Sequence, residues 1–453
     1  MQLEPLGREY RSNKPLVDPI DPDALAADLA GVWEGRTGRD TNRGGTFGPG
    51  PGGPDPRDPA AAGWVFVVDP NDPDKEKIAN ALRPLADLRK MTRPDEPLLY
   101  DSSMEAPDWA IENLDSRDPS PAYVLLVGDG DRIPFDFQIG LGASCNVGRV
   151  AFDSLDDLGT YVDKVVRFAK APPSLNGASV FAPELGPRDA TRVSRQYMAE
   201  PIAASIKDGV GQPVTSLIGE QATREHLMSM LTTTTSRLVY VASHGNFVAE
   251  ATGIAEQRRI NGAIVCQPTG HETSQDDSIL FGADLPADKP IAEGSVFFQF
   301  GCYGYGTPAS NSFADYVTTM PKKNTANDFV AALPKRLLAH RRGPVAFIGH
   351  ADLAWVHGFD DPDAPMLAEL YSPRLHPFTG AVRALLNRVP AGYSLLDFRE
   401  RTAGFDHVLA SAAAKFSKKI EIDKNRARLS STYITRTDAM YHLLFGDPGV
   451  AVG

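Results

Sequence analysis

The chain has 453 residues, of which 42% are apolar and 23% charged, and its formal net charge is −12. This length exceeds one ordinary hydrophobic core and predicts two or three domains or subdomains, with the composition of a soluble globular protein. No apolar run reaches the roughly 18 residues of a membrane span, and the acidic balance gives the molecule no electrostatic attraction to nucleic acid.

Three cysteines, Cys145, Cys266 and Cys302, are too few for a disulfide framework and fit a reducing compartment. The segment Met1–Glu9 has no hydrophobic signal core, so we expect a cytoplasmic protein. Cys145 and Cys266 have no reactive neighbour in the sequence and are interpreted as structural. A zinc site from Cys302, Cys266 and His244 would lack the usual close ligand spacing, so no metal or cofactor is expected.

Residues 1–63 are predicted to be an N-terminal extension, with a short helix from Pro22 to Trp33 and a linker over 36–63. The linker is rich in Gly, Pro and Asp and cannot bury enough surface to order itself. This extension could inhibit, recruit a partner or merely trail the rest of the chain.

Residues 64–172 are predicted to form a smaller α/β subdomain. Apolar runs indicate strands, and helical spacing indicates helices between them. The strands are expected at 64–68, 123–127 and 145–150, and the helices at 74–89 and 154–170.

The Pro172–Pro173 pair marks a boundary, and residues 173–453 are predicted to form the larger subdomain. Its strands are expected at 178–182, 214–218, 237–243, 295–300 and 345–348, and its helices near 190–208, 223–231 and 326–341. An insertion without clear periodicity covers about 250–293, and the remainder is mostly helical. Strands that alternate with helices predict a mostly parallel sheet flanked by helices.

Two of these strands end on reactive side chains. His244 and Gly245 follow the apolar run from Val239, and Gly301 and Cys302 follow the run from Val296. Because strand carboxyl ends in a parallel sheet line the ligand crevice, an imidazole and a thiol are expected at one rim. A cysteine nucleophile needs this arrangement, and the N–H groups of Gly245 and Cys302 could form an oxyanion hole. The pattern predicts a cysteine peptidase of caspase-like build.

The sequence also resembles the gingipain family of cysteine peptidases, in the caspase-like clan. The resemblance spans about residues 120–450, and more faintly 64–120. The matching segments, in order, are Ala122–Asp129 with Ile133-Pro134, Val147–Arg149, Ser243–Gly245, Gly301-Cys302, Gly343–Ile348 and Phe445–Pro448.

The resemblance implies an α/β subdomain followed by a caspase-like sheet that carries the dyad. It also implies endopeptidase activity through a thioester on Cys302, with His244 as general acid and base. Protein or peptide substrates are expected, with room for an activating partner, and the role would be regulated proteolysis or a defence response of the cell-death type. The alternatives are a catalytically silent binding scaffold and a thiol transpeptidase.

Further site residues follow from the same resemblance. Arginine-specific members carry a pocket acid before the Val-Gly-Arg strand, where Gly140 stands here, and the nearest upstream carboxylate is Asp136. Either Asp136 or Asp129 is expected to orient His244, and Asp129 could instead line the substrate site or a turn. Trp355 is expected to form an aromatic pocket wall or to be ordinary core. Arg258-Arg259, within the insertion, is interpreted as a solvated basic turn, with a processing site as the alternative.

Overall fold

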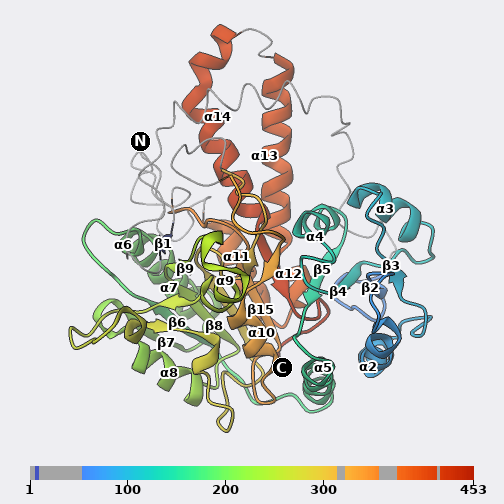
Figure 1. The fold of residues 1–453 in the computed structure, drawn as a ribbon, viewed down its shortest axis with the longest axis horizontal. Coiled ribbons are helices and arrows are strands. Elements are labelled where there is room, and N and C mark those ends of the chain that lie inside the picture. The colour runs from blue at the N-terminus through green and yellow to red at the C-terminus, as the bar shows by residue number, and fades with distance from the viewer. Residues whose placement is uncertain (1–5, 10–53, 314–321, 357–374, 416–418) are drawn as a thin grey trace.

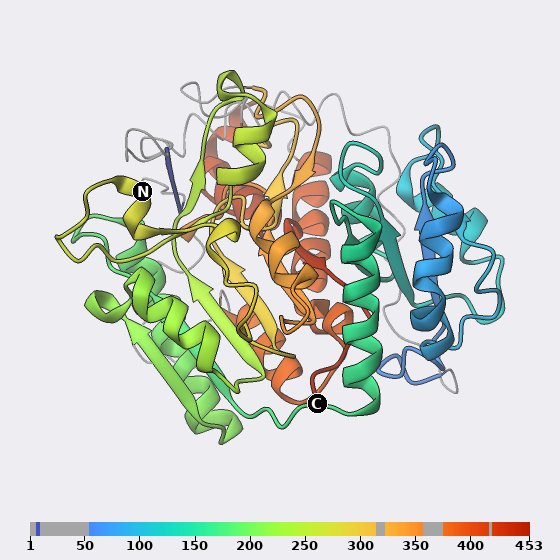
Figure 2. The same ribbon diagram turned by 60° about the horizontal axis from the view of Figure 1, so that its bottom comes forward.

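The computed structural model describes residues 6–9, 54–313, 322–356, 375–415 and 419–453. The expected helix from Pro22 to Trp33 and most of the linker lie outside the described residues. The described part is a mixed α/β fold with a ten-stranded, mostly parallel sheet flanked by helices, which confirms the predicted fold class (Figures 1 and 2). No helix within the described ranges is long and apolar enough to cross a membrane.

The large sheet is built from short strands, most of them buried on both faces, as the continuous apolar runs predict. In pairing order its strands are β3 (Leu98–Leu99), β2 (Trp64–Val68), β4 (Tyr123–Val127), β5 (Asn146–Val150), β16 (His442–Phe445), β15 (Ala346–His350), β12 (Val296–Phe300), β8 (Leu238–Ala242), β6 (Ala178–Ala182) and β7 (Val214–Ile218).

Two blocks of parallel strands make up this sheet, and they run in opposite directions. Strands β3, β2, β4, β5 and β16 are mutually parallel, and so are β15, β12, β8, β6 and β7. The blocks meet where β16 pairs antiparallel with β15. The strands of one block therefore end at the level where the strands of the other block begin.

Helices lie on both faces of the sheet, and two long helices, α13 and α14, pack together and project from the body in Figure 1. The helices are α2 (Lys75–Leu88), α3 (Ala106–Asn113), α4 (Phe135–Gly142), α5 (Leu155–Lys170), α6 (Ala190–Ser194), α7 (Glu200–Ala204), α8 (Arg224–Thr233), α9 (Ile254–Ile260), α10 (Ala332–Ala339), α11 (His376–Leu386), α12 (Ala391–Ser394), α13 (Leu396–Lys415) and α14 (Lys419–Met440). Single π-helical segments follow α6 and α7, at Arg195–Ala199 and Ser205–Val210.

The interval for which the sequence shows no periodicity is partly ordered. It contributes two strands, β10 and β11, to a second, four-stranded sheet whose order is β1, β9, β10, β11. These strands are β1 (Gly7–Glu9), β9 (Gly245–Phe247), β10 (Ile264–Val265) and β11 (Ile279–Leu280). A two-stranded sheet pairs β13 (Gly306–Thr307) with β14 (Phe329–Val330). Part of the N-terminal extension, β1, therefore joins the sheet that begins directly after His244.

The predicted boundary near residue 172 does not interrupt the large sheet, because β5 and β16 pair across it. A Cβ on Gly148 would lie 2.2 Å from the carbonyl oxygen of Gly446, so only glycine fits this crossing. The buried Asp447 carboxylate then accepts hydrogen bonds from Trp64 Nε1 (2.9 Å) and Arg89 Nε (2.9 Å). Residues from both sides of the boundary are thus joined by one buried polar cluster.

Candidate active site

The ends of strands β8 and β12 place His244 beside Cys302. The two strands pair in parallel, with Ala242 opposite Phe300, so each reactive residue lies two positions beyond a matched pair. A Cβ on Gly245 would lie 1.8 Å from the carbonyl oxygen of Cys302. This contact shows that the backbones after both strands touch, and that Gly245 cannot be replaced without moving one of them.

The imidazole of His244 is held by an acid that the sequence reasoning missed. His244 Nε2 lies 2.8 Å from Asp189 Oδ1, and the side chains are only 3% and 5% exposed. The same oxygen accepts hydrogen bonds from Thr191 N (2.9 Å) and Thr191 Oγ1 (2.6 Å). A carboxylate in this position fixes the imidazole orientation and stabilises an imidazolium.

A signal for Asp189 was present in the sequence. It follows the predicted strand 178–182 and immediately precedes a predicted helix, where it is the N-cap of α6. Strand β6 is the direct parallel neighbour of β8, so their carboxyl ends share one edge. His244 and Cys302 were singled out because carboxyl ends of parallel strands line the ligand crevice. The same reasoning, applied to β6, would have found Asp189.

Cys302 lies in a tight turn after β12. Gly304 N donates to the Gly301 carbonyl at 3.2 Å, and Tyr303 between them adopts a positive φ of 57°. A non-glycine residue in this left-handed region costs conformational energy, and such residues concentrate at functional sites. The turn directs the thiol toward Ala354, whose N–H lies 3.2 Å from Cys302 Sγ.

The thiol of Cys302 is fully buried in this structure. Burial raises its pKa well above the ordinary value, and the negative charges of Asp352 and Asp438 act in the same direction. The N–H donated by Ala354 works against this rise but does not offset it. Cys302 is therefore a neutral thiol in the arrangement described here.

A short N-terminal segment covers this thiol. Leu6 is fully buried, its N–H donates to the Ala354 carbonyl (2.6 Å), and its carbonyl accepts from the Cys302 N–H (3.1 Å). The following residues form β1, which pairs in parallel with β9 and places Gly7 opposite Gly245. Both amide groups proposed for the oxyanion hole thus lie beside the peptide that joins Leu6 to Gly7.

The acid whose contact with His244 the structure shows is Asp189, so a role for Asp136 or Asp129 in orienting the imidazole stays a prediction. Asp129 directly follows β4, which belongs to the opposite block and is five strand positions from β8. At about 4.8 Å per strand this is roughly 24 Å, more than a side chain can span. Asp136 lies in the first turn of α4.

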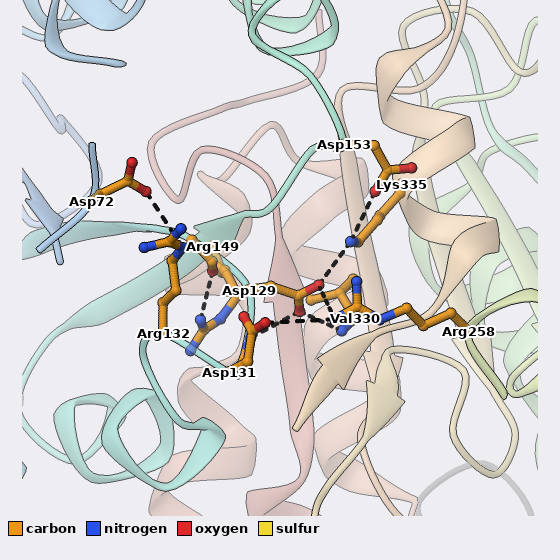
Figure 3. A network of polar contacts seen from close by, with 11 residues as sticks. Asp72, Asp129, Asp131, Arg132, Arg149, Asp153, Arg258, Val330 and Lys335 are labelled. Atoms are coloured by element: carbon orange, nitrogen blue, oxygen red, sulfur yellow. Dashed lines mark hydrogen bonds and ion pairs between the residues drawn. The ribbon is translucent and has the colours of Figure 1, made fainter. Parts of the chain in front are cut away.

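Asp129 belongs instead to a polar network in which its carboxylate is already occupied (Figure 3). It accepts from Val330 N (2.7 Å) and from Lys335 Nζ (2.8 Å), and Arg258 lies 3.7 Å away. These partners come from β14, α10 and α9. Asp129 therefore anchors these segments to the end of β4 rather than lining the edge that carries His244.

Arg258 and Arg259 lie on helix α9, where the sequence interpretation expected a turn. Arg259 contacts Glu256 on the same helix at 2.8 Å, and Arg258 reaches Asp129 and Asp131. Proteolytic processing needs an extended backbone, so the helix opposes a cut at this pair in the folded chain.

Trp355 is buried, and its ring packs edge-to-face against Phe313 with centroids 4.8 Å apart. Trp355 directly follows Ala354, which contacts both Leu6 and Cys302. A role for Trp355 as a wall of the substrate pocket stays a proposal. Cys145 and Cys266 are buried, and burial raises the pKa of the Cys145 thiol to about 12. Both agree with a structural role.

One cluster in the described part of the chain has the composition of a metal site. Ligand atoms of His350, Asp438 and His442 lie within 4.8 Å of one another. However, both ring nitrogens of His350 already have main-chain partners, because Nδ1 lies 2.8 Å from the Asp352 carbonyl and Nε2 lies 3.1 Å from the Asp438 carbonyl. The His442 ring stacks on Phe398 at 4.4 Å, and desolvation, with some help from His350, lowers its pKa to about 3. These imidazoles serve as hydrogen-bonding core residues.

Comparisons with known proteins add a weak likeness. No family model matches the chain, and no curated protein matches it. A solved structure described as "Structure of Protease" is similar in fold, with a TM-score of 0.49 and 12% sequence identity. The match covers 86% of this chain and 78% of that one.

Proposed function

We propose that the protein is a cysteine endopeptidase whose catalytic residues are Cys302 and His244, with Asp189 as the residue that positions the imidazole. The observation that carries the proposal is the buried contact between His244 and Asp189 at the end of β8, directly beside Cys302 on the paired strand β12. Residues from three neighbouring parallel strands therefore converge at one edge. The gingipain-like order of motifs in the sequence agrees with this proposal.

In the proposed reaction, His244 takes the proton of the Cys302 thiol as the sulfur attacks the carbonyl carbon of the peptide. The oxyanion that forms accepts hydrogen bonds from the N–H groups of Cys302 and Gly245. His244 then gives its proton to the leaving amine, which leaves a thioester on Cys302. Water, deprotonated by His244, hydrolyses the thioester and frees the thiol.

Asp189 has a positioning role in this scheme. It contacts the imidazole at Nε2, so in this scheme Nδ1 is the nitrogen that exchanges a proton with the thiol. Since the carboxylate is also fixed by Thr191, it holds the ring in place through the cycle.

Mass spectrometry of wild-type protein and the Cys302→Ala variant, each incubated with a diverse peptide library, tests the proposal. Because Leu6 covers the thiol, we expect slow cleavage by the wild type and none by Cys302→Ala, and the new termini report the preferred residue before the cut. Product masses also separate hydrolysis from transfer to an amine, the outcome expected of a transpeptidase. The absence of Cys302-dependent cleavage, including in a variant with an opened site, would leave a binding scaffold as the better description.

A further inference from the structure

The N-terminal segment contacts the proposed active site in the way that a substrate must. An endopeptidase binds its substrate in an extended conformation, with the carbonyl before the cut against the oxyanion donors. Leu6 meets this requirement, because its carbonyl accepts from the N–H of Cys302 at 3.1 Å. Its own N–H is bound by Ala354, so both main-chain groups of Leu6 are paired with the site.

Residues on the other side of this carbonyl continue in the same extended path. Gly7, Arg8 and Glu9 pair with Gly245, Asn246 and Phe247 in a parallel ladder. The segment therefore crosses the site, with Leu6 before the position of the cut and Gly7 after it. If residues 6–9 served only as an extra strand of the small sheet, the Leu6 carbonyl would not need to accept from the Cys302 N–H.

We propose that residues 6–9 occupy the catalytic site as an internal pseudosubstrate, and that Leu6 identifies the residue before the cut as a leucine-type aliphatic one. This inference rests on the proposed function and names the substrate class and regulation of that site. The segment excludes external peptides from Cys302 until it is displaced.

The burial of Leu6 supports the aliphatic preference. Its side chain is 0% exposed and belongs to the main hydrophobic cluster, which also contains Phe247 and Trp355. A basic side chain buried there would need a carboxylate partner, whereas leucine needs apolar contact alone.

Burial of the catalytic groups supports the inhibitory role. Cys302 is fully buried and His244 is 3% exposed, so no external peptide reaches the thiol in this arrangement. The N-terminal segment is held by the two main-chain hydrogen bonds of Leu6, by its buried side chain, and by the pairing of the three residues of β1 with β9. Such a short segment can be displaced by cleavage or by a partner without unfolding the large sheet.

The test compares full-length wild type with Leu6→Asp, which places a charge in an apolar site, and with Leu99→Asp as a control. Leu99 is 47% exposed, so its replacement adds the same charge without touching the core. Iodoacetamide labelling at pH 8, followed by peptide mapping, measures the reactivity of each thiol. We expect Cys302 in Leu6→Asp to react roughly 10- to 100-fold faster, the change that losing one buried leucine side chain gives at 25 °C.

Cys145 and Cys266 are buried internal references and should keep their wild-type rates. If all three thiols react faster, the substitution has loosened the whole fold, and the uncharged variant Leu6→Gly then decides between the two explanations. Wild-type reactivity of Cys302 in a folded Leu6→Gly protein would overturn the pseudosubstrate.

The specificity is measured on Leu6→Asp with matched peptides that carry leucine or arginine before the cut. We expect kcat/KM to favour leucine by at least about 10-fold, since an uncompensated buried charge is costly. A preference for arginine would overturn the inference while leaving Cys302-dependent hydrolysis, and hence the proposed function, intact. Conversely, faster labelling of Cys302 without hydrolysis of any peptide would support the docked segment and count against the peptidase.

Discussion

Replacing Asp189 by asparagine tests the residue that sequence reasoning missed. The contact between His244 Nε2 and Asp189 Oδ1 is 2.8 Å long, and both side chains are almost fully buried. A hydrogen bond to a charged group contributes about 1.5–3 kcal/mol, so its loss in the transition state corresponds to roughly a 10- to 150-fold fall in kcat. Because Asp189 acts through His244 and not on the substrate, KM should change little.

Asparagine keeps an oxygen that can accept from Thr191, so the cap of α6 survives in Asp189→Asn and the free energy of unfolding should fall by less than about 1 kcal/mol. Asp189→Ala loses both contacts and should be about 1 kcal/mol less stable still, with activity no higher than that of the asparagine variant. Steady-state kinetics on a peptide identified by library cleavage, together with urea unfolding, separate the effects. Full kcat in Asp189→Asn, or a change confined to KM, would refute the positioning role.

Three further outcomes are expected. Gly245→Ala should reduce kcat/KM at least about 100-fold in a folded protein, because its Cβ would lie 1.8 Å from the Cys302 carbonyl and displace the oxyanion donors; near wild-type kinetics would contradict this. Asp447→Ala should cost about 3–5 kcal/mol in urea unfolding, since it leaves the largely buried Arg89 guanidinium without its carboxylate; a loss below about 1 kcal/mol would argue against the cluster. The pKa of His442 is lowered to about 3, so the unfolded chain binds a proton that the native chain does not, and this group reduces stability as pH falls below about 6.5. At pH 5 the loss is about 2 kcal/mol, and His442→Phe should flatten the slope between pH 6.5 and 4 in unfolding curves; an unchanged slope would refute the assignment.

The strands of the large sheet could be predicted from the sequence because they are buried on both faces. A strand such as Val296–Phe300 then reads as a continuous apolar run, which no amphipathic helix produces. The same burial made the neighbouring positions of His244 and Cys302 foreseeable. Short strands such as β10 and β11, two residues each, carry no period and could not be found in this way.

Asp129 lies away from His244 for a topological reason. In a wholly parallel sheet all strands have their carboxyl ends on the same side. Here β16 pairs antiparallel with β15, which reverses the direction of one block. Asp129 satisfies the local pattern but follows a strand of the reversed block. No residue near Asp129 in the sequence encodes this reversal, because it depends on a pairing with a strand some 300 positions away.

The amino-acid sequence was enough to predict the α/β class, the approximate bounds of the buried strands, and the pair of strand ends that carry His244 and Cys302. These follow from burial period and residue type, which are local properties of the chain. The contacts of Asp189 with His244 and of Leu6 with Cys302 became visible only in the folded chain. Both contacts join residues far apart in the sequence, through a hydrogen bond and a strand pairing whose energy depends on three-dimensional proximity rather than on local pattern.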